Sequence, residues 1–137
     1  MKVVLDPNVL VAALLSSGGS PAELIRRWKH GRFDVVVSPA LLGELGRVLG
    51  YPKLRRRIDE ELASAVIEDL RRHALLVDDP SEPSPLRASD PDDDHLLALA
   101  SRTGAAIVSG DKHLLVLADQ APIFSPAGFV AHLDASD

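Results

Sequence analysis

Cysteine is absent from this chain of 137 residues, and aromatic side chains are scarce, with one Trp, one Tyr and three Phe. The lack of cysteine excludes disulfides, cysteine nucleophiles and zinc sites built from thiolates. The few aromatic residues supply no stacking platform of the kind that RNA-recognition modules use. No apolar run approaches the roughly 18 residues of a membrane-spanning helix. Residues 1–6 are too short and too soon acidic for a signal peptide, so we expect a cytoplasmic protein that does not associate with a membrane.

Positive charge is also in the minority. The 15 Lys and Arg residues against 20 Asp and Glu residues give a net charge of −5. This balance argues against a surface that binds nucleic acid everywhere by charge, and it leaves room for local basic clusters. The length predicts a single domain at residues 1–137, and a hydrophobic content of 46% is enough for one core.

Short apolar runs alternate with helical patterns along the chain, an order that is typical of βαβ units. The predicted strands are residues 2–5, 34–37, 74–77, 105–108 and 122–124. The pattern therefore predicts an α/β fold, a three-layer α/β/α sandwich around a mainly parallel sheet. Ligands of such folds bind beyond the carboxyl ends of the strands.

Serine–proline pairs and glycines mark the ends of the predicted helices. Ser20, Ser38 and Ser125 each precede a proline, the order expected of a capping residue and the first helical position. Gly104 is placed to end the helix that follows residue 91. Residues 51–72 predict a short helix and then a longer one. The apolar face of the longer helix consists of Leu62, Val66 and Leu70.

Four acidic side chains stand where a divalent cation site would need them. Asp6 follows the first strand, and Asp111 follows the strand at 105–108. Asp93 lies in an acidic helix start, and Glu44 borders the leucine stripe of another helix. Clustered carboxylates raise one another's pKa unless a cation joins them, so their placement at element ends predicts one cation-binding spot. Ordinary roles stay open as well: a helix cap for Asp6, an exposed helix edge for Glu44 and a turn for Asp111.

Helical spacing selects Asp93 among the acids of residues 90–94. The stripe at i, i+4, i+7 and i+11 consists of Asp93, Leu97, Ala100 and Gly104. If this stripe faces the sheet, Asp93 points toward the strand ends. Asp90 is then expected to cap the helix, and Asp92 and Asp94 are expected to flank the site.

A site made only of carboxylate oxygens suits Mg²⁺ or Mn²⁺, which are hard cations. Such a site polarises a phosphoryl oxygen and generates hydroxide near neutral pH, so the implied reaction class is phosphodiester hydrolysis. Asn8 and Ser109 are placed to support the neighbouring carboxylates or a water. Lys112 and His113 are placed to meet a phosphate, unless they are simply solvated.

Four segments together resemble the PIN-domain nucleases, and specifically the small prokaryotic toxin components akin to VapC. In chain order they are Val4-Leu5-Asp6-Pro7-Asn8-Val9-Leu10-Val11, Ser38-Pro39-Ala40-Leu41-Leu42-Gly43-Glu44-Leu45, Asp90-Pro91-Asp92-Asp93-Asp94-His95-Leu96-Leu97-Ala98-Leu99-Ala100 and Val108-Ser109-Gly110-Asp111-Lys112-His113-Leu114. The resemblance implies an α/β/α sandwich and a ribonuclease dependent on Mg²⁺ or Mn²⁺. It implies that Asp6, Glu44, Asp93 and Asp111 are the catalytic and metal-binding acids. The chain departs from the family pattern at Pro7, where threonine is more common.

The resemblance also implies partners. Members of this group are commonly paired with an antitoxin protein that fills the active-site groove, and they often form homodimers. RNA, as the substrate, has to be held through its phosphates. We expect the basic run Arg55, Arg56 and Arg57 to contribute, although a solvated helical face explains it equally well.

Two other functions are compatible with the same residues. The first is a catalytically inactive PIN-like module that binds RNA or a protein partner. The second is a phosphate-accepting receiver-like domain, in which Asp78 or Asp79 would accept the phosphoryl group. The receiver alternative leaves Glu44 and Asp93 unexplained.

Overall fold

Apolar runs and capped helices organise the chain into alternating strands and helices. The computed structural model describes residues 1–88 and 90–136, and of Asp92 the backbone alone. The elements, in chain order, are β1 (Lys2–Leu5), α1 (Pro7–Leu15), α2 (Ser20–Lys29), β2 (Asp34–Val37), α3 (Pro39–Leu49), α4 (Pro52–Arg55), α5 (Glu60–His73), β3 (Leu75–Leu76), α6 (Pro91–Thr103), β4 (Ala106–Val108), α7 (Lys112–Leu115), β5 (Ile123–Phe124) and α8 (Pro126–Ala135).

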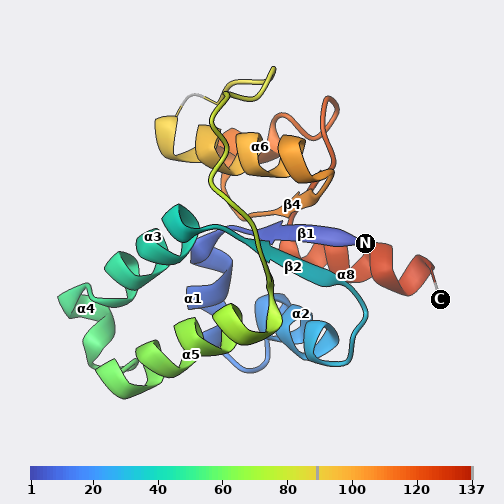
Figure 1. Cartoon of the computed structure of the whole chain (residues 1–137). Coiled ribbons are helices and arrows are strands. Elements are labelled where there is room, and N and C mark those ends of the chain that lie inside the picture. Colours follow the sequence, from blue (N-terminus) through green and yellow to red (C-terminus); the bar gives the residue numbers. More distant parts are fainter. Residues whose placement is uncertain (89, 137) are drawn as a thin grey trace.

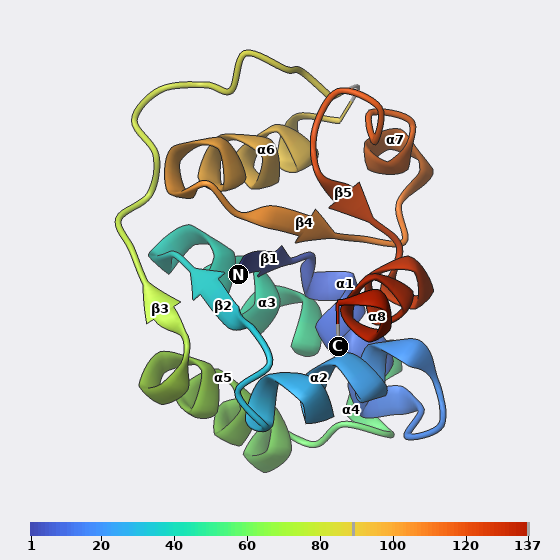
Figure 2. The same cartoon turned by 90° about the vertical axis from the view of Figure 1, so that its right-hand side faces the viewer.

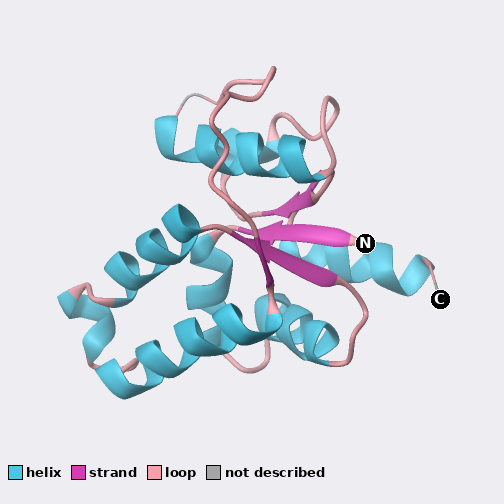
Figure 3. Ribbon diagram, in the orientation of Figure 1, coloured by secondary structure: helices cyan, strands magenta, loops and turns pink. Residues whose placement is uncertain are grey.

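The strands form one sheet in the order β3-β2-β1-β4-β5, and every strand pairing is parallel. Helix α6 covers one face, whereas α1, α2, α3 and α5 lie on the other (Figures 1 and 3). The view in Figure 2 shows α7 on the same side of the sheet as α6, and α8 beside α2. The predicted α/β/α sandwich is confirmed, with a sheet that is parallel throughout the described part of the chain.

The hydrophobic core is centred on β1, the middle strand of the sheet. Val3, Val4 and Leu5 are between 0% and 1% exposed because helices cover them from both faces. A parallel sheet buried on both faces requires such continuous apolar strands. Among the described residues, no single helix is both long and apolar enough to cross a membrane, and only α1 with α2, bent at 101°, meets those criteria as a pair.

The strand predictions are confirmed, with small changes at their ends. Residues 2–5 and 34–37 form β1 and β2 as predicted. The strand predicted at 74–77 narrows to Leu75–Leu76, because the Ala74 N–H still bonds to the Leu70 carbonyl of α5. Gly104 ends α6 with a φ of +72°, a backbone conformation that glycine adopts without steric cost.

Two of the three predicted serine caps are confirmed. The Ser38 side chain accepts a hydrogen bond from the Leu41 N–H, and Ser125 accepts from the Gly128 N–H. Ser20 is different, because α2 begins at Ser20 itself and its N-cap is Gly19. The Glu23 N–H bonds to the Gly19 carbonyl at 3.2 Å, so the helical bonding starts one residue earlier than predicted.

The predicted apolar face of α5 is correct only toward its C-terminus. Leu70 is buried and Val66 packs against the core, but Leu62 is 41% exposed. Figure 1 shows the reason, since the N-terminal end of α5 extends beyond the sheet toward α4. Residues that continue a helical stripe lose their burial where the helix leaves the core.

Candidate metal-binding and catalytic site

The carboxyl ends of β1 and β4 lie side by side at the centre of the sheet. Leu5 is in register with Val108, and the Asp6 N–H donates to the Val108 carbonyl at 3.0 Å. The residues that follow these two strands therefore share one edge, as expected where parallel strands end together. Asp6 and Ser109 meet there although most of the chain separates them in sequence.

Ser109 links the first and the last of the predicted acids. Its hydroxyl donates to Asp6 Oδ2 at 2.7 Å and accepts from the Asp111 N–H at 3.0 Å. Ser109 is fully buried, and Asp6 is only 5% exposed. The bond holds the Asp6 carboxylate in place and fixes the turn that carries Asp111. The predicted supporting role of Ser109 thus has a definite geometry.

Asp6 has a structural role as well as its place in the cluster. Its Oδ1 accepts a hydrogen bond from the Asn8 N–H at 3.0 Å, which caps α1, while Oδ2 faces Ser109. The cap and the cluster therefore use different oxygens of one carboxylate. Asn8 contributes this backbone N–H, and Asn8 itself is exposed at the mouth of the site.

Asp93 is an acid with a strongly raised pKa. It lies in the first turn of α6, is 6% exposed, and its Oδ2 has no hydrogen-bond partner among those residues. Burial, as the largest cause, and a hydrogen bond with the Asp111 carboxyl contribute to raising the pKa of Asp93 from 3.8 to about 7. The negative charges of Asp111, Asp90 and Asp6 act in the same direction. Asp93 therefore faces the other acids, as its helical stripe predicts.

Asp111 occupies the turn between β4 and α7. Its Oδ1 accepts from the His113 N–H at 2.8 Å and so caps this short helix. The Asp111 side chain also lies within hydrogen-bonding reach of Asp93. Lys112 and His113 are exposed immediately beside it, where a phosphate from solvent can approach them.

The remaining predicted acids are Glu44 and the two that flank Asp93, Asp92 and Asp94. Glu44 is half-buried on α3, and its membership of the acidic set stays a prediction. The Asp94 carboxylate accepts from the Ala88 N–H at 2.6 Å and pairs with Arg87 at 3.6 Å, which ties down the preceding loop. The side chain of Asp92 lies outside the described residues.

His95 is a residue that the sequence patterns did not single out. Its Nε2 lies 3.3 Å from the Ser38 hydroxyl and 3.8 Å from Asp79 Oδ1. Asp79 in turn accepts from the Ala40 N–H at the start of α3. These contacts join the first turn of α6 to the start of α3. Because the start of α3 and the start of α6 are far apart in the sequence, no local pattern predicts these contacts.

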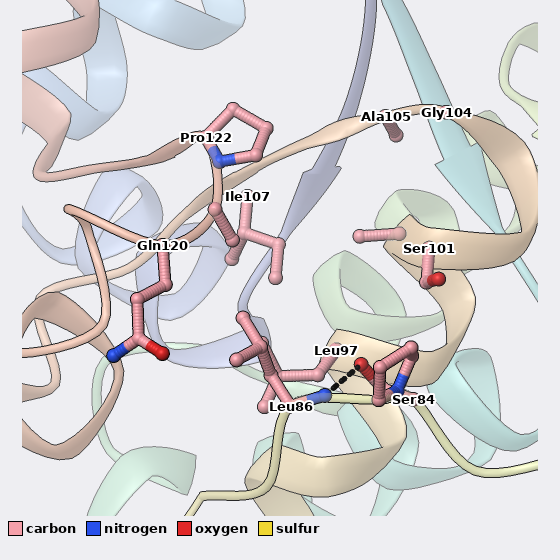
Figure 4. A pocket seen from close by; sticks show the side chains of 12 residues that line it. Ser84, Leu86, Leu97, Ser101, Gly104, Ala105, Ile107, Gln120 and Pro122 are labelled. Carbon is pink, nitrogen blue, oxygen red and sulfur yellow. Dashed lines mark hydrogen bonds between the residues drawn. The ribbon is translucent and has the colours of Figure 1, made fainter.

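A cavity of about 480 Å³ opens onto two of the acids, Asp6 and Asp111. It is lined by Asp6, Asn8, Val9, Ala12, Pro21, Gly110, Asp111 and Pro126. A second cavity, of about 370 Å³, lies at the opposite end of β4, between α6 and the loops at Leu86 and Pro122 (Figure 4). Its lining contains no acidic side chain, and most of it is apolar. Of these two cavities, the first is the one lined by acidic side chains.

The donor set fits a hard divalent cation. Asp6, Asp93 and Asp111 offer carboxylate oxygens, the ligands that Mg²⁺ and Mn²⁺ prefer. The Asp93 Oδ2 without a partner among the described residues and the raised Asp93 pKa both fit a site that lacks a positive charge. In the described part of the chain, however, no three Asp, Glu or His side chains already stand in metal-binding geometry. The acids fit the ion by chemistry, and side-chain adjustment is needed to hold it.

The raised Asp93 pKa predicts a pH dependence of stability in the absence of divalent cations. The folded chain binds the Asp93 proton more tightly than the unfolded chain does. The contribution of this proton to the free energy of unfolding is therefore complete below pH 3.8 and is lost as the pH rises through about 7. Relative to Asp93→Asn, the wild-type free energy of unfolding should fall by on the order of 1 kcal/mol or more over this interval. Urea unfolding at several pH values measures it. Asp119→Asn, at an exposed acid, is the control, and identical pH profiles of wild type and Asp93→Asn would contradict the prediction.

Comparison with known proteins agrees with this geometry. The family profile of the PIN domain matches residues 2–113. The uncharacterized protein MJ1680 of Methanocaldococcus jannaschii is 28% identical over 120 residues, which cover 88% of this chain and 77% of the relative. The crystal structure of PAE2754 from Pyrobaculum aerophilum superposes with a TM-score of 0.60 at 17% identity, over 98% of this chain and 90% of that one, which shows a shared fold. The chain belongs to the PIN domain family.

Proposed function

We propose that the protein is an endoribonuclease that hydrolyses RNA phosphodiester bonds with the help of Mg²⁺ or Mn²⁺. The observation that carries the proposal is the convergence of Asp6, Asp93 and Asp111 beside an open cavity, with Asp93 buried and its pKa raised. Membership of the PIN domain family supports it, because PIN domains are generally nucleases. Glu44 is included in the acidic set as part of the proposal.

The residues around the cavity have separate tasks in this proposal. Asp93 and Asp111 hold the cation, and Ser109 keeps Asp6 directed at it. When bound, the cation polarises a phosphoryl oxygen and lowers the pKa of an attached water. Lys112 and His113, exposed beside Asp111, contact the neighbouring phosphates.

A second candidate is a PIN-like module that binds RNA or a protein without cutting. One observation favours it: among the described residues no three-ligand metal group is already assembled. The two candidates differ in turnover. A binding module retains RNA without cleaving it and shows little thermal shift with Mn²⁺.

The nuclease proposal predicts that Asp6→Asn and Asp93→Asn each lower Mn²⁺-dependent cleavage of a mixed-sequence single-stranded RNA by about 100-fold or more, because each removes a charged cation ligand. EDTA should abolish wild-type cleavage, and added Mn²⁺ should restore it. Asp119→Asn should cleave like the wild type, and circular dichroism checks that every variant is folded. Equal cleavage by Asp93→Asn and wild type, after separate purification, would refute the proposal.

The basic run at the end of α4 is proposed to hold the RNA backbone. Arg55, Arg56 and Arg57 are exposed, and Arg57 also donates to the Leu15 carbonyl at 2.7 Å, which anchors this segment to α1. Arg55 and Arg56 therefore carry the proposed phosphate contacts, because their loss leaves that anchor in place.

The double variant Arg55→Gln/Arg56→Gln should raise KM and leave kcat unchanged, because the contacts are equal in the ground and transition states. The slope of log affinity against log salt should become shallower by about 1 for each lost phosphate contact. Arg71→Gln, at an exposed arginine of α5, serves as the control. An unchanged salt slope would assign the RNA path to another surface.

We also propose that the protein is the toxin of a cytoplasmic toxin–antitoxin pair. The support is the order of the four acidic segments, which resembles the small prokaryotic toxin components. Induction of the protein in a bacterial host should then arrest growth, Asp93→Asn should not, and co-induction of a small protein encoded beside it should relieve the arrest. Normal growth on induction, with the folded protein detected by blotting, would argue against a toxin.

A further inference from the structure

The edge strand β3 exposes its apolar side chains. It lies at one end of the strand order, and Figure 2 shows it at one margin of the molecule with no strand beyond it. Leu75 is 41% exposed and Leu76 is 55% exposed, whereas Ala74 and Val77 on either side pack against the core. A short segment with anchored ends therefore presents two leucines to solvent.

The backbone of β3 has hydrogen-bonding groups directed outward. The Val77 N–H donates to the Val37 carbonyl of β2 at 2.9 Å. Because the backbone groups of successive strand residues point to opposite sides, the N–H and C=O of Leu76 point away from β2. Unpaired groups on an edge strand are a template for pairing with a further strand.

The charges around β3 are arranged so that the segment complements itself. Arg72 and His73 precede the strand, and Asp78 and Asp79 follow it. Among the described residues, Arg72 and His73 form exposed contacts within α5, with Glu68 at 3.3 Å and Asp69 at 3.6 Å respectively. Asp78 is exposed, and Asp79, which accepts from the Ala40 N–H, has a side chain that is 41% exposed.

We propose that β3 is the surface through which two copies of the chain form a dimer, with their β3 strands antiparallel across a twofold axis. The family resemblance implies a homodimer but names no surface for it. In a twofold antiparallel interface, the start of the segment in one copy lies beside its end in the other copy. A segment with cations first, leucines in the middle and carboxylates last is therefore complementary to a second copy of itself. A different protein strand would not require this symmetry.

The direction of the backbone groups fixes the register. Leu76 of one copy lies opposite Leu76 of the other, because the outward N–H and C=O of both can then pair. Leu75 faces Val77 of the second copy. Arg72 and His73, at the C-terminal end of α5, then lie on the same side of the twofold axis as Asp78 and Asp79 of the second copy. The two sheets join into one continuous sheet.

The test is the oligomeric state of the full chain, measured by sedimentation over a range of concentrations. Leu76→Lys and Asp78→Arg should each raise the dimer dissociation constant by about 10-fold or more, the first by placing charge on the axis and the second by opposing like charges. The double variant Arg72→Asp/Asp78→Arg restores opposite charges across the axis. It should therefore recover most of the lost association.

Leu62→Lys is the matched control, because Leu62 is as exposed as Leu75 but lies at the far end of α5. It should leave the dissociation constant unchanged, and circular dichroism should show all variants folded. A wild-type chain that is monomeric at concentrations on the order of 100 µM would overturn the proposal, as would Leu76→Lys dimerising as well as Leu62→Lys. Neither result depends on RNA cleavage, which is assayed separately.

Discussion

The burial of one carboxylate among others is the constraint on which this site depends. Asp93 is almost completely enclosed, close to Asp111, Asp90 and Asp6, and none of these neighbours supplies positive charge. The fold tolerates the arrangement because Asp93 holds a proton up to about pH 7. A divalent cation would resolve the same conflict without the proton, and this supports the proposal that the cluster binds one.

The fold was largely predictable because burial on both faces leaves a strong local signature. The Val-rich runs of β1 and β2 are short, continuous and bounded by polar residues, and their ends match the prediction. Asp93 was predictable for a related reason, since its stripe with Leu97 and Ala100 shows which side of α6 is covered. Both apolar residues of that stripe are buried.

The contacts that build the site between elements were less predictable. The sequence suggested that Ser109 supports a carboxylate, but its bond to Asp6 depends on the pairing of β1 with β4. Asp94 lies beside Asp93 in sequence, yet its described contacts go to Arg87 and Ala88. Local spacing determines which face a side chain occupies, whereas its partner is set by which distant segment packs there.

The bond between Ser109 and Asp6 joins residues 103 positions apart in the sequence. One half of the acidic site is therefore synthesised long before the other half. A nascent polypeptide on the ribosome has Asp6 long before it has β4, so the cluster assembles only when the fourth strand docks against the first.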